Sequence, residues 1–159
     1  MSMRLYLVHH ADAVGPAVDA QRPLSARGLA QAAWLADEAR VRGTRPMLIW
    51  HSGKLRSRQT AEQFLRVCSP SAAFRAARGL LPDDPTVWMA DALSLEDQDT
   101  LVVGHIPHLP ALARILGASD PLPLNGMIAL ERTDATKYQQ LWCLKPPRVL
   151  PEDTSGRPG

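Results

Sequence analysis

The fold is decided by a short apolar stretch near the N-terminus that ends in two histidines, Leu5-Tyr6-Leu7-Val8-His9-His10. Its apolar part is compact and partly β-branched, which is typical of a strand buried on both faces. Polar residues follow the run at once. The sequence therefore predicts a central strand whose carboxyl end carries a pair of histidines.

Further strands and helices alternate along the rest of the chain. Buried strands are predicted at residues 47–50 and 100–103, a shorter one at 73–75, and a hairpin-like pair at 127–131 and 138–144. Helices are predicted from an N-cap at Ser25 to a stop at Gly43, and at 54–67, 86–93 and 108–116. This alternation predicts an α/β fold, a three-layer α/β/α sandwich around a mostly parallel central sheet.

Length and composition indicate one domain. The chain has 159 residues, 45% of them hydrophobic, so we expect a single packed domain at 1–145. Residues 146–159 are rich in Pro, Gly and charge and are expected to form an irregular or disordered tail.

The net charge of +2 argues against nucleic acid as a partner, and the N-terminal apolar run is too short for a membrane span. With two cysteines in no disulfide-like or metal-like pattern, we expect a soluble cytoplasmic protein.

Three of the predicted strands end at reactive side chains. These ends are His9-His10, His51-Ser52 and Gly104-His105. One histidine at a strand end is not informative, but three such ends in a chain with five histidines indicate a shared site. Ligands of open α/β sheets bind beyond the carboxyl ends of the strands, so these side chains should converge on one rim.

Arginines accompany this rim. Arg22 follows the first predicted strand, and Arg56 and Arg58 follow the second. A guanidinium offers a planar fork of donors that fits phosphate oxygens, and a helix start near Lys54 adds free backbone N–H groups. The sequence thus predicts a site for phosphate or another oxyanion.

Four segments, in order and at matching spacing, resemble the histidine phosphatase superfamily, and within it the small SixA-type phosphohistidine phosphatases. The first, Val8-His9-His10-Ala11-Asp12, stands at the family's Arg-His-Gly signature. The others are Arg22-Pro23-Leu24-Ser25, Ser52-Gly53-Lys54-Leu55-Arg56-Ser57-Arg58-Gln59-Thr60-Ala61 and Gly104-His105-Ile106-Pro107-His108-Leu109. The resemblance covers roughly residues 4–145 and implies a phosphoglycerate mutase-like fold.

The resemblance also implies roles for particular residues. His10 would be the nucleophile that takes the phosphoryl group, and His105 would donate a hydrogen bond to it. Arg22 and Arg56 would hold its oxygens, with His9 at the remaining phosphate-binding position. In the loop where larger relatives place an acid, Asp83 and Asp84 are the candidate general acids. The scheme needs no metal and no cofactor.

Two residues depart from the family pattern: His9 replaces the signature arginine and Ala11 replaces its glycine. Loss of an arginine clamp can cost on the order of 3 kcal/mol of transition-state stabilisation. We therefore hypothesise an activity that is low, pH-dependent or absent. If His9 acts as a cation, activity should rise as the pH falls toward its pKa.

The expected function is removal of a phosphoryl group through a phosphohistidine intermediate on His10. Phosphohistidine of a protein is the first choice of substrate, by resemblance, and small phosphomonoesters are the second. One alternative is a weak or inactive protein that binds phosphate or phosphohistidine, which the His9 departure favours. Another is a metal-dependent hydrolase, because His105 and His108 are spaced by about one helical turn.

Overall fold

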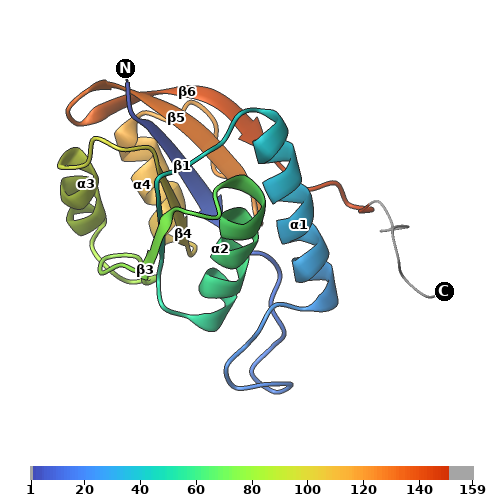
Figure 1. Cartoon of the computed structure of the whole chain (residues 1–159). Coiled ribbons are helices and arrows are strands. Elements are labelled where there is room, and N and C mark those ends of the chain that lie inside the picture. The colour runs from blue at the N-terminus through green and yellow to red at the C-terminus, as the bar shows by residue number, and fades with distance from the viewer. Residues whose placement is uncertain (1, 151–159) are drawn as a thin grey trace.

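The protein is built on one six-stranded sheet, seen in a computed structural model that describes residues 2–150 (Figure 1). The strands are β1 (Arg4–His9), β2 (Leu48–His51), β3 (Ala73–Ala76), β4 (Thr100–Gly104), β5 (Met127–Asp134) and β6 (Lys137–Leu144). Their order across the sheet is β3-β2-β4-β1-β5-β6. β1 to β4 are parallel, whereas β5 runs antiparallel to β1 and β6 antiparallel to β5. The predicted mostly parallel sheet and its late hairpin are confirmed.

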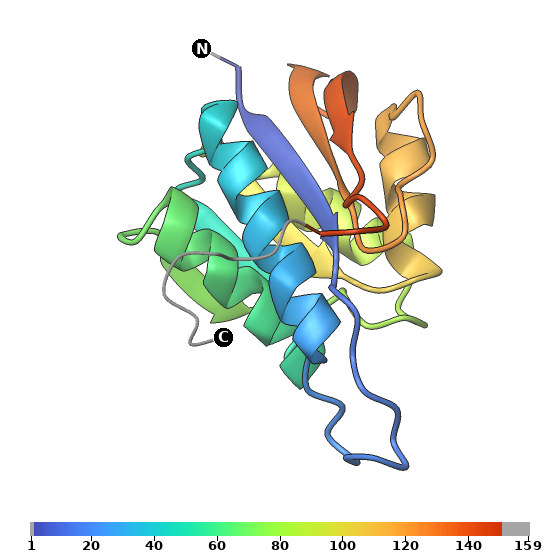
Figure 2. The same cartoon turned by 90° about the vertical axis from the view of Figure 1, so that its right-hand side faces the viewer.

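Within residues 2–150, four helices cover the two faces of this sheet. Helices α1 (Ala26–Val41) and α2 (Leu55–Cys68) lie on one face, and α3 (Thr86–Ser94) and α4 (His108–Leu116) lie on the other (Figures 1 and 2). The three-layer sandwich predicted from the alternating pattern is therefore confirmed.

The alternating faces of each strand divide the core into two apolar layers. In β1, Leu5 and Leu7 pack with the side chains of α3 and α4, whereas Tyr6 and Val8 pack with those of α1 and α2. All four side chains are at most 2% exposed. Burial on both faces is why this strand reads as a continuous apolar run rather than an alternating one.

Helix α1 begins at the predicted cap. The side chain of Ser25 accepts a hydrogen bond from the backbone N–H of Gly28 at 3.0 Å, which satisfies one of the donors left free at a helix start. The helix ends just before Gly43, which adopts a positive φ of 84° that a residue without a side chain tolerates readily.

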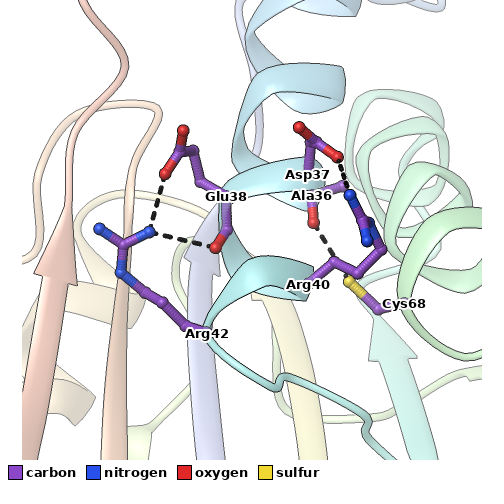
Figure 3. Close-up of polar contacts among 6 residues, drawn as sticks. All are labelled: Ala36, Asp37, Glu38, Arg40, Arg42 and Cys68. Atoms are coloured by element: carbon purple, nitrogen blue, oxygen red, sulfur yellow. Dashed lines mark hydrogen bonds and ion pairs between the residues drawn. The ribbon is translucent and has the colours of Figure 1, made fainter.

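Polar contacts close the last turns of α1 (Figure 3). Arg40 pairs with Asp37 and Arg42 pairs with Glu38, each at 2.8 Å. The thiol of Cys68 donates to the carbonyl of Ala36 at 3.3 Å and so connects the end of α2 to α1. Burial raises the pKa of Cys68 to about 11, so this cysteine stays protonated.

After β6 the chain has no regular secondary structure up to residue 150. The remainder of the predicted irregular tail, residues 151–159, lies outside the described part of the chain. None of the helices described within residues 2–150 is long and apolar enough to cross a membrane.

Candidate active site

The parallel pairing of the central strands brings the predicted histidines to one rim. His9 at the end of β1 is in register with Gly104 at the end of β4, and His51 at the end of β2 is in register with Val103. The ring of His10 then lies 4.4 Å from that of His9 and 5.1 Å from that of His105, centroid to centroid. The convergence expected from the sequence is present in the structure.

His10 is held as a neutral imidazole with one nitrogen available. Its Nδ1 lies 2.7 Å from the backbone carbonyl of Ala11. A carbonyl oxygen can only accept, so Nδ1 carries the proton and Nε2 keeps its lone pair. Burial, followed by the charges of Arg56 and Arg22, lowers the pKa of His10 to about 4 despite the hydrogen bond to Ala11.

His9 is also neutral, with the opposite tautomer. The backbone N–H of Asn125 donates to its Nδ1 at 2.8 Å, which leaves the proton on Nε2. Burial, and then the neighbouring His10, lower the pKa of His9 to about 3. The hypothesis of a cationic His9 is corrected, because a buried imidazole that lies near Arg56 and already accepts a backbone N–H does not take up a second proton near neutral pH.

Ser52 determines the tautomer of His105. The Ser52 hydroxyl oxygen lies 2.6 Å from Nε2 of His105 and also accepts from the backbone N–H of Lys54 at 3.3 Å. Nε2 is the sole acceptor of the Ser52 hydroxyl among residues 2–150, so we assign the hydroxyl proton to this bond and the ring proton to Nδ1. That Nδ1 is buried and has no hydrogen-bond partner among residues 2–150. Burial is the main cause that lowers the pKa of His105 to about 3.

Arg22 and Arg56 supply the positive charge near these rings, and both act on the pKa of His10. Burial and then the charge of Arg22 lower the pKa of Arg56. Within the described residues neither arginine forms an ion pair with a carboxylate, and the buried Nε of Arg56 has no partner. Two neighbouring cations without a carboxylate partner in the described residues are suited to an anion.

The loop that carries Arg22 is fixed in an uncommon backbone conformation. Arg22 has a φ of 51°, in the left-handed region that non-glycine residues seldom adopt. Its Nε donates to the carbonyl of Val14 at 3.0 Å, and its backbone N–H donates to the carbonyl of Asp19 at 3.0 Å. These two hydrogen bonds across the loop fix the position of the Arg22 guanidinium.

Asp12 joins this loop to the start of α1. Its carboxylate accepts from the Ser25 hydroxyl at 2.6 Å, and its backbone N–H donates to Gln31 at 2.9 Å. The backbones approach so closely that a Cβ on Gly28 would lie 1.9 Å from the Asp12 carbonyl oxygen. Only glycine fits there.

Asp83 and Asp84 lie in the loop that precedes α3. A carboxylate oxygen of Asp84 accepts from the backbone N–H of Leu81 at 2.9 Å. Neither aspartate forms a hydrogen bond with His10 or His105 in the described structure, so their role as general acid stays a prediction.

Three side chains that hold the site were not assigned a role from the sequence. Thr60 accepts from the backbone N–H of Ala11 at 3.0 Å, and Gln59 accepts from that of Leu24 at 2.7 Å. The side-chain amide of Asn125 donates to the His10 carbonyl at 2.8 Å. Asn125-Gly126 is a turn signal, but a turn signal does not say which strand end the turn will contact.

His105 and His108, on which the metal alternative rests, have no third ligand among the described residues. Throughout residues 2–150, no three His, Cys, Asp or Glu side chains form a group that could hold a metal ion. His108 is buried with both ring nitrogens unpartnered within that range, and Asp84 is the acidic group that acts on its pKa.

The fold is that of solved histidine phosphatase structures. A proposed phosphohistidine phosphatase SixA from Agrobacterium tumefaciens superposes with a TM-score of 0.76 at 24% identity, over 92% of this chain and 99% of that one. A second such SixA, from Nakamurella multipartitia, gives a TM-score of 0.78 at 19% identity, over 92% and 97% of the two chains. A protein histidine phosphatase SixA complexed with tungstate gives 0.77 at 19% identity, over 89% and 96%.

Other structures of the same fold include a phosphoglycerate mutase from Plasmodium falciparum, with a TM-score of 0.67 at 17% identity over 89% of this chain and 90% of that one. No protein-family model matches the sequence, and no curated protein matches it. The phosphoglycerate mutase-like fold implied by the resemblance is confirmed.

Proposed function

We propose that this chain is a phosphatase of the histidine phosphatase superfamily in which His10 takes the phosphoryl group. The observation that carries the proposal is the tautomer of His10. Its Nδ1–H is committed to the Ala11 carbonyl at 2.7 Å, and its lowered pKa leaves Nε2 unprotonated at neutral pH. A nucleophilic imidazole needs both conditions.

In the first step, the lone pair of His10 Nε2 forms a bond to phosphorus. The bond from phosphorus to the leaving group breaks, and its electron pair departs with that group. Arg22 and Arg56 balance the negative charge on the equatorial oxygens, and Nδ1–H of His105 donates to one of them. His9 contributes a neutral donor, Nε2–H, where the family has a cation.

In the second step, water attacks the phosphorus of the phosphohistidine. The N–P bond breaks, its electron pair returns to Nε2, and a proton of the attacking water passes to solvent or to the phosphate released. His10 is thereby restored, still fixed by the Ala11 carbonyl. No metal or cofactor takes part in either step.

Phosphohistidine of a protein is the proposed substrate. An imidazole whose second nitrogen is protonated leaves as a neutral molecule, with a pKa of about 6.5, and so needs little help from an acid. An alkoxide, by contrast, needs a proton from a general acid as it leaves. The free thiols of Cys68 and Cys143 agree with our proposal that the reaction takes place in the cytoplasm.

A phosphate-binding protein without turnover is the second candidate, favoured by the neutral His9 in place of an arginine. Trapping of the intermediate separates the two candidates. With a radiolabelled phosphoryl donor and a quench in alkaline detergent, which spares the N–P bond, the wild type should become labelled and His10→Ala should not. Phosphate binding without any label in the wild type would favour the binding protein.

A further inference from the structure

A basic cavity adjoins the phosphoryl site at the start of α2. It has a volume of about 350 Å³ and is lined by Gln21, Gly53, Lys54, Arg56 and Arg58, among others. None of the described residues that line it carries a carboxylate. The cavity therefore offers three cationic side chains and one amide on a mainly polar surface.

The charges of this cavity are only partly neutralised. Arg58 forms an ion pair with Glu62 at 3.2 Å, and both side chains are about half exposed. Lys54 forms no ion pair within residues 2–150. The cavity thus keeps a positive charge beyond the one that Arg56 shares with the phosphoryl site.

Arg56 connects the two regions. It lines the cavity, and its charge also acts on His9, His10 and His105. The charge of Lys54 likewise acts on His105. A ligand that extends from His10 past Arg56 would therefore reach Lys54.

From this arrangement we infer that the cavity is a second anion subsite, which selects substrates carrying a further acidic group close to the phosphoryl group. Lys54 and Arg58 bind that group, a carboxylate or a second phosphate, while Arg56 stays on the transferring phosphoryl. The acidic group is supplied either by an Asp or Glu side chain beside the phosphohistidine of a protein or by a small phosphorylated acid. The inference rests on the proposed function for the placement of the phosphoryl group.

Binding to His10→Ala tests the subsite without any turnover. Two matched pairs of ligands serve as probes: 3-phosphoglycerate against glycerol 3-phosphate, and a phosphohistidine peptide with flanking Asp against the same peptide with flanking Asn. We expect the acidic member of one pair to bind about fivefold more tightly at low salt, a preference that weakens as salt is raised. The pair that shows the preference identifies the source of the acidic group.

When Lys54→Gln and Arg58→Gln are both added to His10→Ala, the preference for the acidic ligand should be lost. When Arg66→Gln is added instead, the preference should remain. Arg66 is an exposed cation in the last turn of the same helix and hydrogen-bonds to Gln63, so it controls for loss of charge alone. Equal affinities in both pairs, a preference that survives the double substitution, or one lost equally in Arg66→Gln would each overturn the subsite. Failure of the wild type to become labelled would overturn the phosphatase proposal instead, and the binding ratios would still decide the subsite.

Discussion

The hydroxyl oxygen of Ser52 lies 2.6 Å from Nε2 of His105, and this contact leaves the buried Nδ1 of the same ring as the proton donor. The two residues come from the ends of neighbouring strands, β2 and β4. We therefore expect Ser52 to act on the proposed reaction only through this ring, by positioning it and by determining which nitrogen carries the proton.

Replacement of Ser52 by alanine should remove this control. We expect kcat to fall about tenfold with little change in KM, because the lost interaction matters most when charge develops on the phosphoryl oxygens. Ser52→Thr keeps the hydroxyl and should retain most of the activity. The nitrogen chemical shifts of the His105 ring report the tautomer directly, and an unchanged Nδ1–H form in Ser52→Ala would contradict the assignment.

Asn125 should support the site through its side chain and its backbone separately. Its amide donates to the His10 carbonyl at 2.8 Å, and its φ of 55° is left-handed. Asn125→Gly keeps the backbone freedom but loses the hydrogen bond, at a cost of about 1 kcal/mol in the free energy of unfolding. Asn125→Ala also incurs the left-handed penalty, about 1 kcal/mol more.

Urea unfolding of these two variants measures both contributions, and their kcat values show whether the contact positions His10. Equal stability of Asn125→Gly and Asn125→Ala would mean that the turn relaxes when the side chain is removed. An unaltered kcat in both variants would show that the contact supports the fold and not the reaction.

His9→Arg should raise activity, because it adds a positive charge where the structure has a neutral ring with a pKa of about 3. An increase in kcat/KM of about tenfold to a hundredfold is expected at pH 7, from typical effects of donors to developing negative charge. In the wild type, kcat/KM should not rise between pH 8 and pH 5, since His9 stays neutral over that range. If kcat/KM of the wild type rises as the pH falls through 6, and that of His9→Arg does not, then His9 acts as a cation.

The free energy of unfolding should decrease as the pH falls below about 6.5. Burial lowers the folded-state pKa of His10 to about 4, and those of His9 and His105 to about 3. Between those values and 6.5 the unfolded chain binds protons that the folded chain does not, so acid favours unfolding by about 1.4 kcal/mol per pH unit for each histidine.

His10→Asn should reduce the pH dependence of the free energy of unfolding by the contribution of one histidine. Urea unfolding at pH 5 and pH 6 measures this change. His51 packs against Phe74, outside the three-ring cluster. Burial also lowers the pKa of His51, so His51→Asn should reduce the slope as well. A slope that is the same in wild type and His10→Asn would show that His10 titrates in the folded protein much as it does in the unfolded chain.

Local chemistry was enough to predict most of the fold. The doubly buried run at Leu5 to Val8, the cap at Ser25 and the stop at Gly43 each depend on neighbours in the sequence, and the structure has all three. The meeting of His10 with His105 also followed from the sequence, because parallel strands align their carboxyl ends.

Properties of the site that arise only when distant segments meet could not be predicted in this way. The neutrality of His9 depends on burial beside His10 and on a backbone N–H from Asn125, which lies 116 residues later. The assignment of the His105 proton to Nδ1 depends on Ser52, 53 residues earlier. Neither residue differs in type from an ordinary turn residue, and only the tertiary contact gives it an electrostatic role.

Arg22 and Arg56 repel each other whenever no anion lies between them. The same pair that receives the substrate's phosphoryl group also fits inorganic phosphate, which keeps the three phosphoryl oxygens and gains its fourth oxygen from water. When the product leaves, the two arginines repel each other again. Free phosphate removes that repulsion as the substrate does, so it competes with the substrate for the site. The enzyme we propose is accordingly subject to product inhibition, and its turnover depends on the phosphate level of its surroundings as well as on its supply of substrate.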